Sequence, residues 1–234
     1  MNTKKLVSIS VISGIKIKIN MKKISIISLS ILFVFTKTVF AQNYRSATPD
    51  EQKELIKNIT AASEQLKSLR ADFLQRKTIS ILADEMLSEG KLLFKQPDKL
   101  CWEYIKPYQY RFTINGNKVM IGSETNKDII DVNSNKIFNE ISKIIISGIN
   151  GSGIFDDQRF SAKFNVGASD YQIMLMPKQK ELKQMFSAIT LVFNKNDYSV
   201  NTVEITQVNG DSTHIAIKNK QINIELNDEI FAVR

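Results

Sequence analysis

The residues of this chain that could support catalysis or bind a metal are few and isolated. The only histidine, His214, stands between Thr213 and Ile215 in an alternating segment, so it is expected to face solvent without a second ligand nearby. Asp156-Asp157 is the only pair of adjacent aspartates, in a glycine-rich context that favours a turn. A glycosidase needs two carboxylates facing each other across a cleft, and adjacent residues point in different directions.

The single cysteine, Cys101, is no better candidate for a nucleophile. It alternates with Trp102, which places it on the opposite face of a strand, and no histidine is near enough in sequence to activate it. A buried structural cysteine is therefore expected, and no internal disulfide can form. The sequence also lacks a Gly-x-Ser-x-Gly elbow, a Walker loop and a dinucleotide fingerprint. We expect no enzyme, no cofactor and no metal site.

The most informative segment is 90–121, which predicts consecutive antiparallel strands. Apolar side chains alternate with polar ones on both sides of Asn115-Gly116, a dipeptide typical of a tight hairpin turn because both of its residues tolerate positive φ. One face of these strands is large and aromatic. We call it the aromatic face, and it carries Phe94, Trp102, Tyr104 and Phe112.

What covers the aromatic face decides the function, and two readings are open. The face is either part of an ordinary hydrophobic core beneath two helices or the wall of an apolar pocket that a mobile lid helix covers. The second reading draws on 137–145, whose isoleucines recur at helical spacing before a glycine-rich exit. The candidate cavity residues are Phe73, Leu92, Phe94, Trp102, Tyr104, Phe112 and Ile114, the candidate lid residues are Ile137, Ile141, Ile144 and Ile145, and the candidate hinge is Gly148, Gly151 and Gly153.

The net charge of +8 comes from the front of the chain. Residues 1–41 hold seven lysines and no acid, which leaves 25 of the 32 basic residues against 24 acidic ones. A balanced remainder argues against nucleic-acid binding, which needs clustered cations in the folded part.

Residues 21–41 predict a secretory signal. Met21-Lys22-Lys23 is a short positive region, Ile24–Phe35 is an apolar stretch of twelve residues, and Val39-Phe40-Ala41 offers small residues for cleavage before Gln42. Lys37 interrupts the stretch too early for a membrane span of roughly 20 residues. We expect the start at Met21, cleavage after Ala41 and one domain over 42–234, with 1–20 either a mis-set upstream start or a long positive region. An uncleaved amphipathic anchor is the alternative.

The elements after the signal predict an α+β domain. Thr48-Pro49-Asp50-Glu51 starts a helix with a capping box, and apolar residues follow at helical spacing as far as Leu69. Ala71 and Phe73 then switch the period to two, and alternation returns from Phe160 to the end. One antiparallel sheet of roughly ten strands with two apolar helices is expected to curl into a partial barrel.

In this order the elements resemble the LolA family of periplasmic outer-membrane lipoprotein carriers, over most of 48–231. The resemblance is carried by Phe73-Leu74-Gln75, by Gly90 through Pro107 with Trp102-Glu103-Tyr104, by Asn115-Gly116-Asn117-Lys118, by Tyr171 through Lys178, and by Phe231. It implies an unclosed antiparallel β-barrel, here of roughly ten to eleven strands, with lid helices over an apolar cavity.

The resemblance also implies a function. A periplasmic monomer would shield the acyl chains of lipoproteins, receive them from an inner-membrane donor transporter complex and release them to an outer-membrane acceptor, with only transient membrane contact. Two alternatives stay open: a sensor or scaffold that binds another protein, and a carrier of a different lipid. A lipid-modifying enzyme would need a polar constellation at the cavity mouth, and the sequence offers none.

One position departs from the family pattern. Members commonly carry Arg just before the proline of the turn after the second strand, where it holds the lid by hydrogen bonds, whereas this chain has Gln96 before Pro97. A neutral amide lacks the charged fork of Arg. Either the lid is held differently, through Lys95 or Arg111, or the cargo is different.

Overall fold

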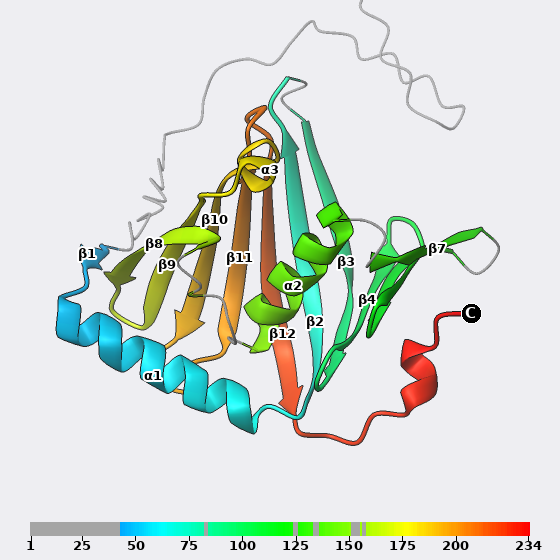
Figure 1. The fold of residues 1–234 in the computed structure, drawn as a ribbon, viewed down its shortest axis with the longest axis horizontal. Coiled ribbons are helices and arrows are strands. Elements are labelled where there is room, and N and C mark those ends of the chain that lie inside the picture. The colour runs from blue at the N-terminus through cyan, green and yellow to red at the C-terminus, as the bar shows by residue number, and fades with distance from the viewer. Residues whose placement is uncertain (1–42, 82–83, 124–125, 133–135, 151–154, 156–157) are drawn as a thin grey trace, which may run out of the picture. The chain divides into compact units, whose positions relative to one another are not determined.

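The computed structural model describes residues 43–81, 84–123, 126–132, 136–150, 155 and 158–234, and gives the backbone alone at 84, 136–141 and 150. They fall in one compact unit, Ala41–Arg234. Its strands form a single antiparallel sheet, with helices α1 and α2 on one side of it and the C-terminal segment beyond β4 (Figure 1).

The elements follow one another in a simple order. The strands are β1 Arg45–Ser46, β2 Ser68–Ile79, β3 Asp84–Lys95, β4 Lys99–Lys106, β5 Tyr110–Asn115, β6 Lys118–Gly122, β7 Lys127–Asp131, β8 Phe160–Val166, β9 Asp170–Pro177, β10 Phe186–Asn194, β11 Val200–Gln207 and β12 Ser212–Ile222. The helices are α1 Pro49–Gln65, α2 Lys136–Asn150, α3 Lys180–Lys183 and the 3-10 helix η2 Asp228–Phe231.

The sheet is open, as expected. Its twelve strands run in the order β1-β8-β9-β10-β11-β12-β2-β3-β4-β5-β6-β7, so β1 and β7 are edges that do not pair with each other. The prediction of roughly ten to eleven strands is slightly low. Strand β1 has only two residues, too few for alternation to register, and in β7 Ile129 and Ile130 are adjacent, which breaks the period.

Helix α1 begins where the sequence predicts. The Thr48 side chain accepts a hydrogen bond from the Glu51 backbone N–H, the Glu51 carboxylate accepts one from the Thr48 N–H, and Pro49 occupies the first turn. This capping box satisfies two backbone donors that the first turn of a helix leaves free. Leu55 and Ile59 follow one turn apart and are buried against the sheet.

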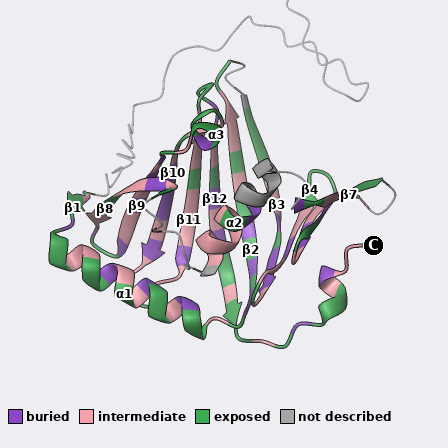
Figure 2. Ribbon diagram, viewed as in Figure 1, coloured by how far each residue is buried: buried purple, intermediate pink, exposed green. Residues whose placement is uncertain are grey.

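The two faces of the sheet are covered differently. The inner face, which carries Leu92, holds the main core together with α1 and α2 (Figure 2). The outer face carries Leu93 and Cys101, which form a smaller buried cluster with Leu226 and Phe231 of the C-terminal segment. Side chains of consecutive strand residues point to opposite faces, so Leu92 belongs to the inner cluster and Leu93, the next residue, to the outer one.

Candidate functional site

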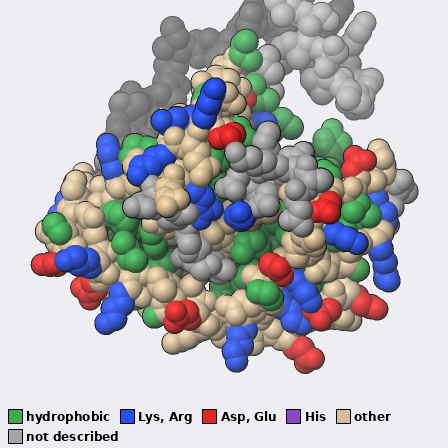
Figure 3. Space-filling model, in the orientation of Figure 1, with side chains coloured by type: hydrophobic (Ala, Val, Ile, Leu, Met, Phe, Trp, Pro, Cys, Tyr) green, Lys and Arg blue, Asp and Glu red, His purple; other side chains and the backbone are tan. Residues whose placement is uncertain are grey.

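An apolar cavity of about 350 Å³ lies between α2 and the inner face of the sheet. None of its lining residues is charged, and Gln75 and Thr213 are the polar ones besides two tyrosines. Hydrophobic side chains show at the middle of this face of the molecule, with charged side chains of both signs around them (Figure 3). The volume is at the small end of the range of about 300–1,000 Å³ found for ligand sites.

Strand register brings part of the aromatic face to the cavity. Leu92 of β3 pairs with Trp102 of β4, and Trp102 pairs with Phe112 of β5, so the three side chains form a row across the sheet. All three line the cavity, and so does Tyr104. Cross-strand neighbours on one face lie about 5 Å apart, so the row is one continuous apolar wall.

Phe73 supports this wall from behind. Its ring centroid lies 5.1 Å from that of Trp102 and 5.1 Å from that of Tyr104, and the residue is 1% exposed. Gly90 makes room for it, because a Cβ at that position would lie 2.7 Å from the Phe73 ring and 1.9 Å from the Glu103 carbonyl oxygen. Phe73 therefore packs against the wall and is not among the residues that line the cavity.

Two other predicted cavity residues belong to the core. Phe94 is 0% and Ile114 1% exposed, and neither lines the cavity. They share the inner face with Trp102, but they lie further along their strands, where Phe94 pairs with Leu100 and Ile114 with Val119. Alternation predicts the face on which a residue lies, but it does not distinguish residues packed in the core from residues that line a cavity.

The polar atoms in the wall are few. The Tyr104 hydroxyl donates a hydrogen bond of 2.9 Å to the Gln75 side-chain oxygen, and burial raises the pKa of this tyrosine. The Trp102 indole N–H is buried and has no hydrogen-bond partner among the described residues. Buried donors usually have an acceptor, and a polar ligand atom or a water molecule in the cavity would supply one for this N–H.

Helix α2 supplies the opposite wall. Ile144, Ile145 and Ile149 line the cavity, together with Gly148. Gly148 lies inside α2, not after it, and the position of a Cβ there has no heavy atom within 4 Å. The side chains of Ile137 and Ile141, and all of Gly151 and Gly153, lie outside what the structure describes, so the lid and hinge stay predictions.

Half of the cavity comes from strands that the sequence analysis did not assign to it. Except for Val200, which lies beyond a register shift in β11, these residues alternate along β9 to β12. That alternation predicts the face on which they lie but not that this face opposes α2. They are Leu175, Ile189, Leu191, Val200, Val203, Ile205, Thr213, Ile215 and Ile217. Gln75 of β2 and Tyr110 of β5 also line the cavity and were not predicted.

The candidates for chemistry lie apart from the cavity. His214 is exposed, as expected, and Cys101 is 1% exposed in the outer cluster, where burial raises the pKa of its thiol. Asp156 and Asp157 lie outside the described residues. Among the residues with described positions, no cluster of potential metal ligands occurs, and no helix is long and apolar enough to span a membrane.

Residues 64–234 match the family model described as outer membrane lipoprotein carrier protein LolA. The chain belongs to the LolA family. Membership supports a carrier or binding role, in agreement with an uncharged, apolar cavity. A comparison with curated proteins finds no match.

Similar solved structures share little sequence with this LolA-family chain. A LolA superfamily protein from Nitrosomonas europaea is 10% identical, with a TM-score of 0.45, over 77% of this chain and 97% of that one. Lipoprotein LppX from Mycobacterium tuberculosis is 13% identical, with a TM-score of 0.44, over 77% and 99%. A chain of the MucA/MucB complex of Pseudomonas aeruginosa is 8% identical, with a TM-score of 0.46, over 77% and 60%.

The position that departs from the LolA pattern contacts α1. The Gln96 side-chain amide donates a hydrogen bond of 3.2 Å to the carbonyl oxygen of Ser63, in the last turn of that helix. Lys95 instead contacts Asp228 and the Leu226 carbonyl oxygen, and Arg111 pairs with Glu103. This chain therefore places a neutral donor, not Arg, against the C-terminal end of α1.

Proposed function

We propose that this protein is a periplasmic carrier that shields the acyl chains of lipoproteins and moves them from the inner to the outer membrane. The observation that carries the proposal is the uncharged cavity of about 350 Å³ between Trp102 and the isoleucines of α2. Burying one acyl CH₂ stabilises a complex by about 0.8 kcal/mol, so a chain of about 16 carbons contributes on the order of 10 kcal/mol.

The proposal includes a lid and its release. Ile144 and Ile145 line the cavity opposite Trp102 and pack against the core, so an acyl chain and α2 compete for the same apolar surface. A carrier that must release its load benefits from that competition, because closure of α2 offsets part of the cost of losing the ligand. Donor and acceptor complexes in the two membranes are the partners this role requires.

Purification of the exported protein under native conditions, followed by mass spectrometry of bound material, tests the proposal. We expect lipid or acylated lipoprotein with the wild type and little with Trp102→Glu, which places a carboxylate in an apolar wall. Ile129→Glu is the matched control, because Ile129 is 50% exposed on β7 and outside the cavity. Equal lipid content in the Trp102 variant would contradict the proposed site.

A sensor or scaffold that binds another protein is the second candidate. Large apolar side chains are exposed at the end of the sheet formed by the β2–β3 and β11–β12 turns, including Ile81 at 89%, Leu87 at 64% and Val208 at 57%. Exposed apolar groups of this kind often mark protein contacts. The same purification separates the two functions, since a scaffold would retain a protein partner and no lipid.

A further inference from the structure

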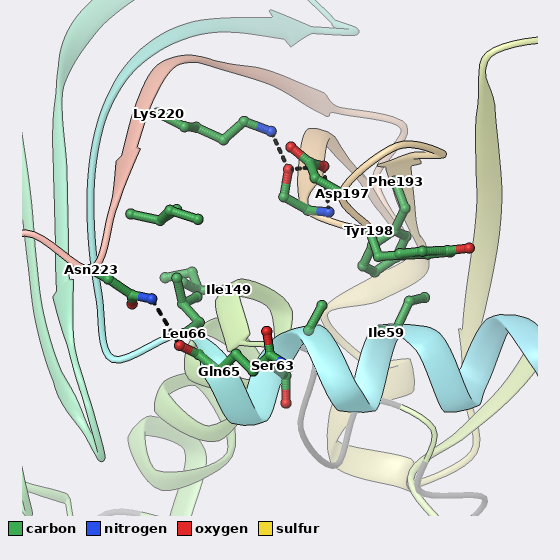
Figure 4. Close-up of a pocket in the computed structure, with 13 residues that line it drawn as sticks. Ile59, Ser63, Gln65, Leu66, Ile149, Phe193, Asp197, Tyr198, Lys220 and Asn223 are labelled. Atoms are coloured by element: carbon green, nitrogen blue, oxygen red, sulfur yellow. Dashed lines mark hydrogen bonds between the residues drawn. The ribbon is translucent and has the colours of Figure 1, made fainter.

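A second cavity of about 370 Å³ lies beside α1 and is not explained by the site above. Its walls come from α1, from the turn that follows β10 and from the end of β12 (Figure 4). Its apolar part is formed by Ile59, Leu66, Phe193 and Ile222. Ile149 of α2 completes the wall, and the same residue lines the first cavity.

Strand β10 leads from one cavity to the other. Leu191 lines the first cavity and Phe193, two residues later, lines the second. Residues two apart on a strand share a face, so both cavities lie on the inner face of the sheet.

A bulge in β12 determines which of its residues line the second cavity. Ile215 and Ile217 face inward and line the first cavity, and strict alternation would next direct residues 219 and 221 inward. The register shifts by one residue between Lys218 and Gln221, where Asn219 adopts a φ of +52°. One extra residue reverses the facing of the rest of the strand, so Lys220 and Ile222 line the second cavity.

The two charged side chains at this cavity, Lys220 and Asp197, already have partners. Lys220 donates to the Ser199 hydroxyl at 2.5 Å and to the Asn201 side-chain oxygen at 2.6 Å, and the Ser199 hydroxyl donates to Asp197 at 2.7 Å. Asn223 donates to the Gln65 carbonyl oxygen at 3.0 Å (Figure 4). A charged headgroup would have to break these bonds, whereas an apolar chain against Ile59, Leu66 and Phe193 would not.

We propose that the two cavities are compartments of one lipid site, that the second takes a further acyl chain of a lipid with more than one chain, and that Ile149 is the partition between them. The inference rests on the proposed function and adds a second compartment to its site. The two cavities have volumes of about 350 and 370 Å³. Movement of α2 removes Ile149 from both walls and joins the compartments.

Filling the second cavity from α1 tests the inference. Ala62 lines it, whereas the neighbouring Ala61 is exposed, so Ala62→Phe and Ala61→Phe form a matched pair. The probes are a fluorescent fatty acid with one chain and a fluorescent diacylglycerol with two. We expect Ala62→Phe to weaken binding of diacylglycerol about tenfold or more, since excluding two methylenes changes affinity by that factor, and to leave fatty acid binding within about twofold.

Ile222→Trp narrows the same cavity from β12 and serves if Ala62→Phe fails to fold. Ile222 is 60% exposed, so its replacement places little demand on the core. Equal binding of diacylglycerol by the Ala62→Phe and Ala61→Phe proteins, or an equal loss of both probes, would overturn the two-compartment site. If the wild type binds fatty acid but not diacylglycerol, only this inference fails. If it binds neither probe, the proposed function fails as well.

Discussion

The Gln96 amide and the Ser63 carbonyl oxygen join the turn after β3 to the last turn of α1 through a hydrogen bond of 3.2 Å. Ser63 is 7% exposed, and its carbonyl oxygen also accepts a hydrogen bond of 3.2 Å from the backbone N–H of Leu66. The contact fixes the helix that forms one wall of the second cavity. It lies at the position where the resemblance to the LolA family predicts Arg.

Two substitutions at Gln96 should change stability in opposite directions. Gln96→Glu keeps the shape but removes the donor and adds a negative charge at a helix C-terminus, so the free energy of unfolding should fall by about 1–3 kcal/mol. Gln96→Arg retains donors and adds a favourable charge, for a gain of about 0.3–1 kcal/mol. Urea unfolding of the three proteins measures both. A Glu variant as stable as the wild type would show that the bond is unimportant.

A charge on the lid should open it. Ile145→Asp places a carboxylate against the apolar wall, at a cost of several kcal/mol unless it is protonated or reaches water, so α2 should detach more often in the lipid-free protein. Hydrogen exchange of residues 142–149 measures this directly. Lys143→Asp is the control, because Lys143 is exposed on the same helix. Unchanged exchange in the Ile145 variant would mean that α2 is fixed core and not a lid.

Much of this architecture was predictable from local pattern, and the missing part has a physical reason. The capping box at Thr48, the outer-face position of Cys101 and the row of Leu92, Trp102 and Phe112 follow from spacing alone. The bulge at Asn219 was not foreseen, because a single extra residue leaves no trace in composition. Which inner-face residues line the cavity depends on the position of α2 over the sheet. That position is set by contacts between residues far apart in the sequence, which local spacing does not reveal.

The C-terminal segment shields Cys101 on the outer face. Phe231 is 0% exposed in the cluster with Cys101, and its carbonyl oxygen accepts a hydrogen bond of 2.9 Å from the Asn115 side-chain amide. Phe231→Ala should free the segment and accelerate labelling of the thiol by a disulfide reagent, most clearly at alkaline pH, because burial raises the pKa of Cys101. Val233→Ala, two residues on, is the control. Equal labelling rates would show that the segment does not protect the thiol.

Export should leave a defined N-terminus. The residues Val39-Phe40-Ala41 predict cleavage before Gln42, so the periplasmic protein should begin at Gln42. N-terminal sequencing of the periplasmic fraction measures this. A protein that retains residues before Ile24 would contradict a cleaved signal and favour an uncleaved anchor.

The only tryptophan of the chain, Trp102, lies in the cavity wall, so its fluorescence reports directly on what occupies the cavity. Titration with a fatty acid brominated in the middle of its chain tests the carrier account, because bromine quenches tryptophan fluorescence only at close contact. We expect saturable quenching that excess unbrominated fatty acid reverses, and no such response with a water-soluble bromide salt at the same concentration. Fluorescence that does not respond to the brominated chain, or that falls without saturation, would show that no acyl chain enters beside Trp102.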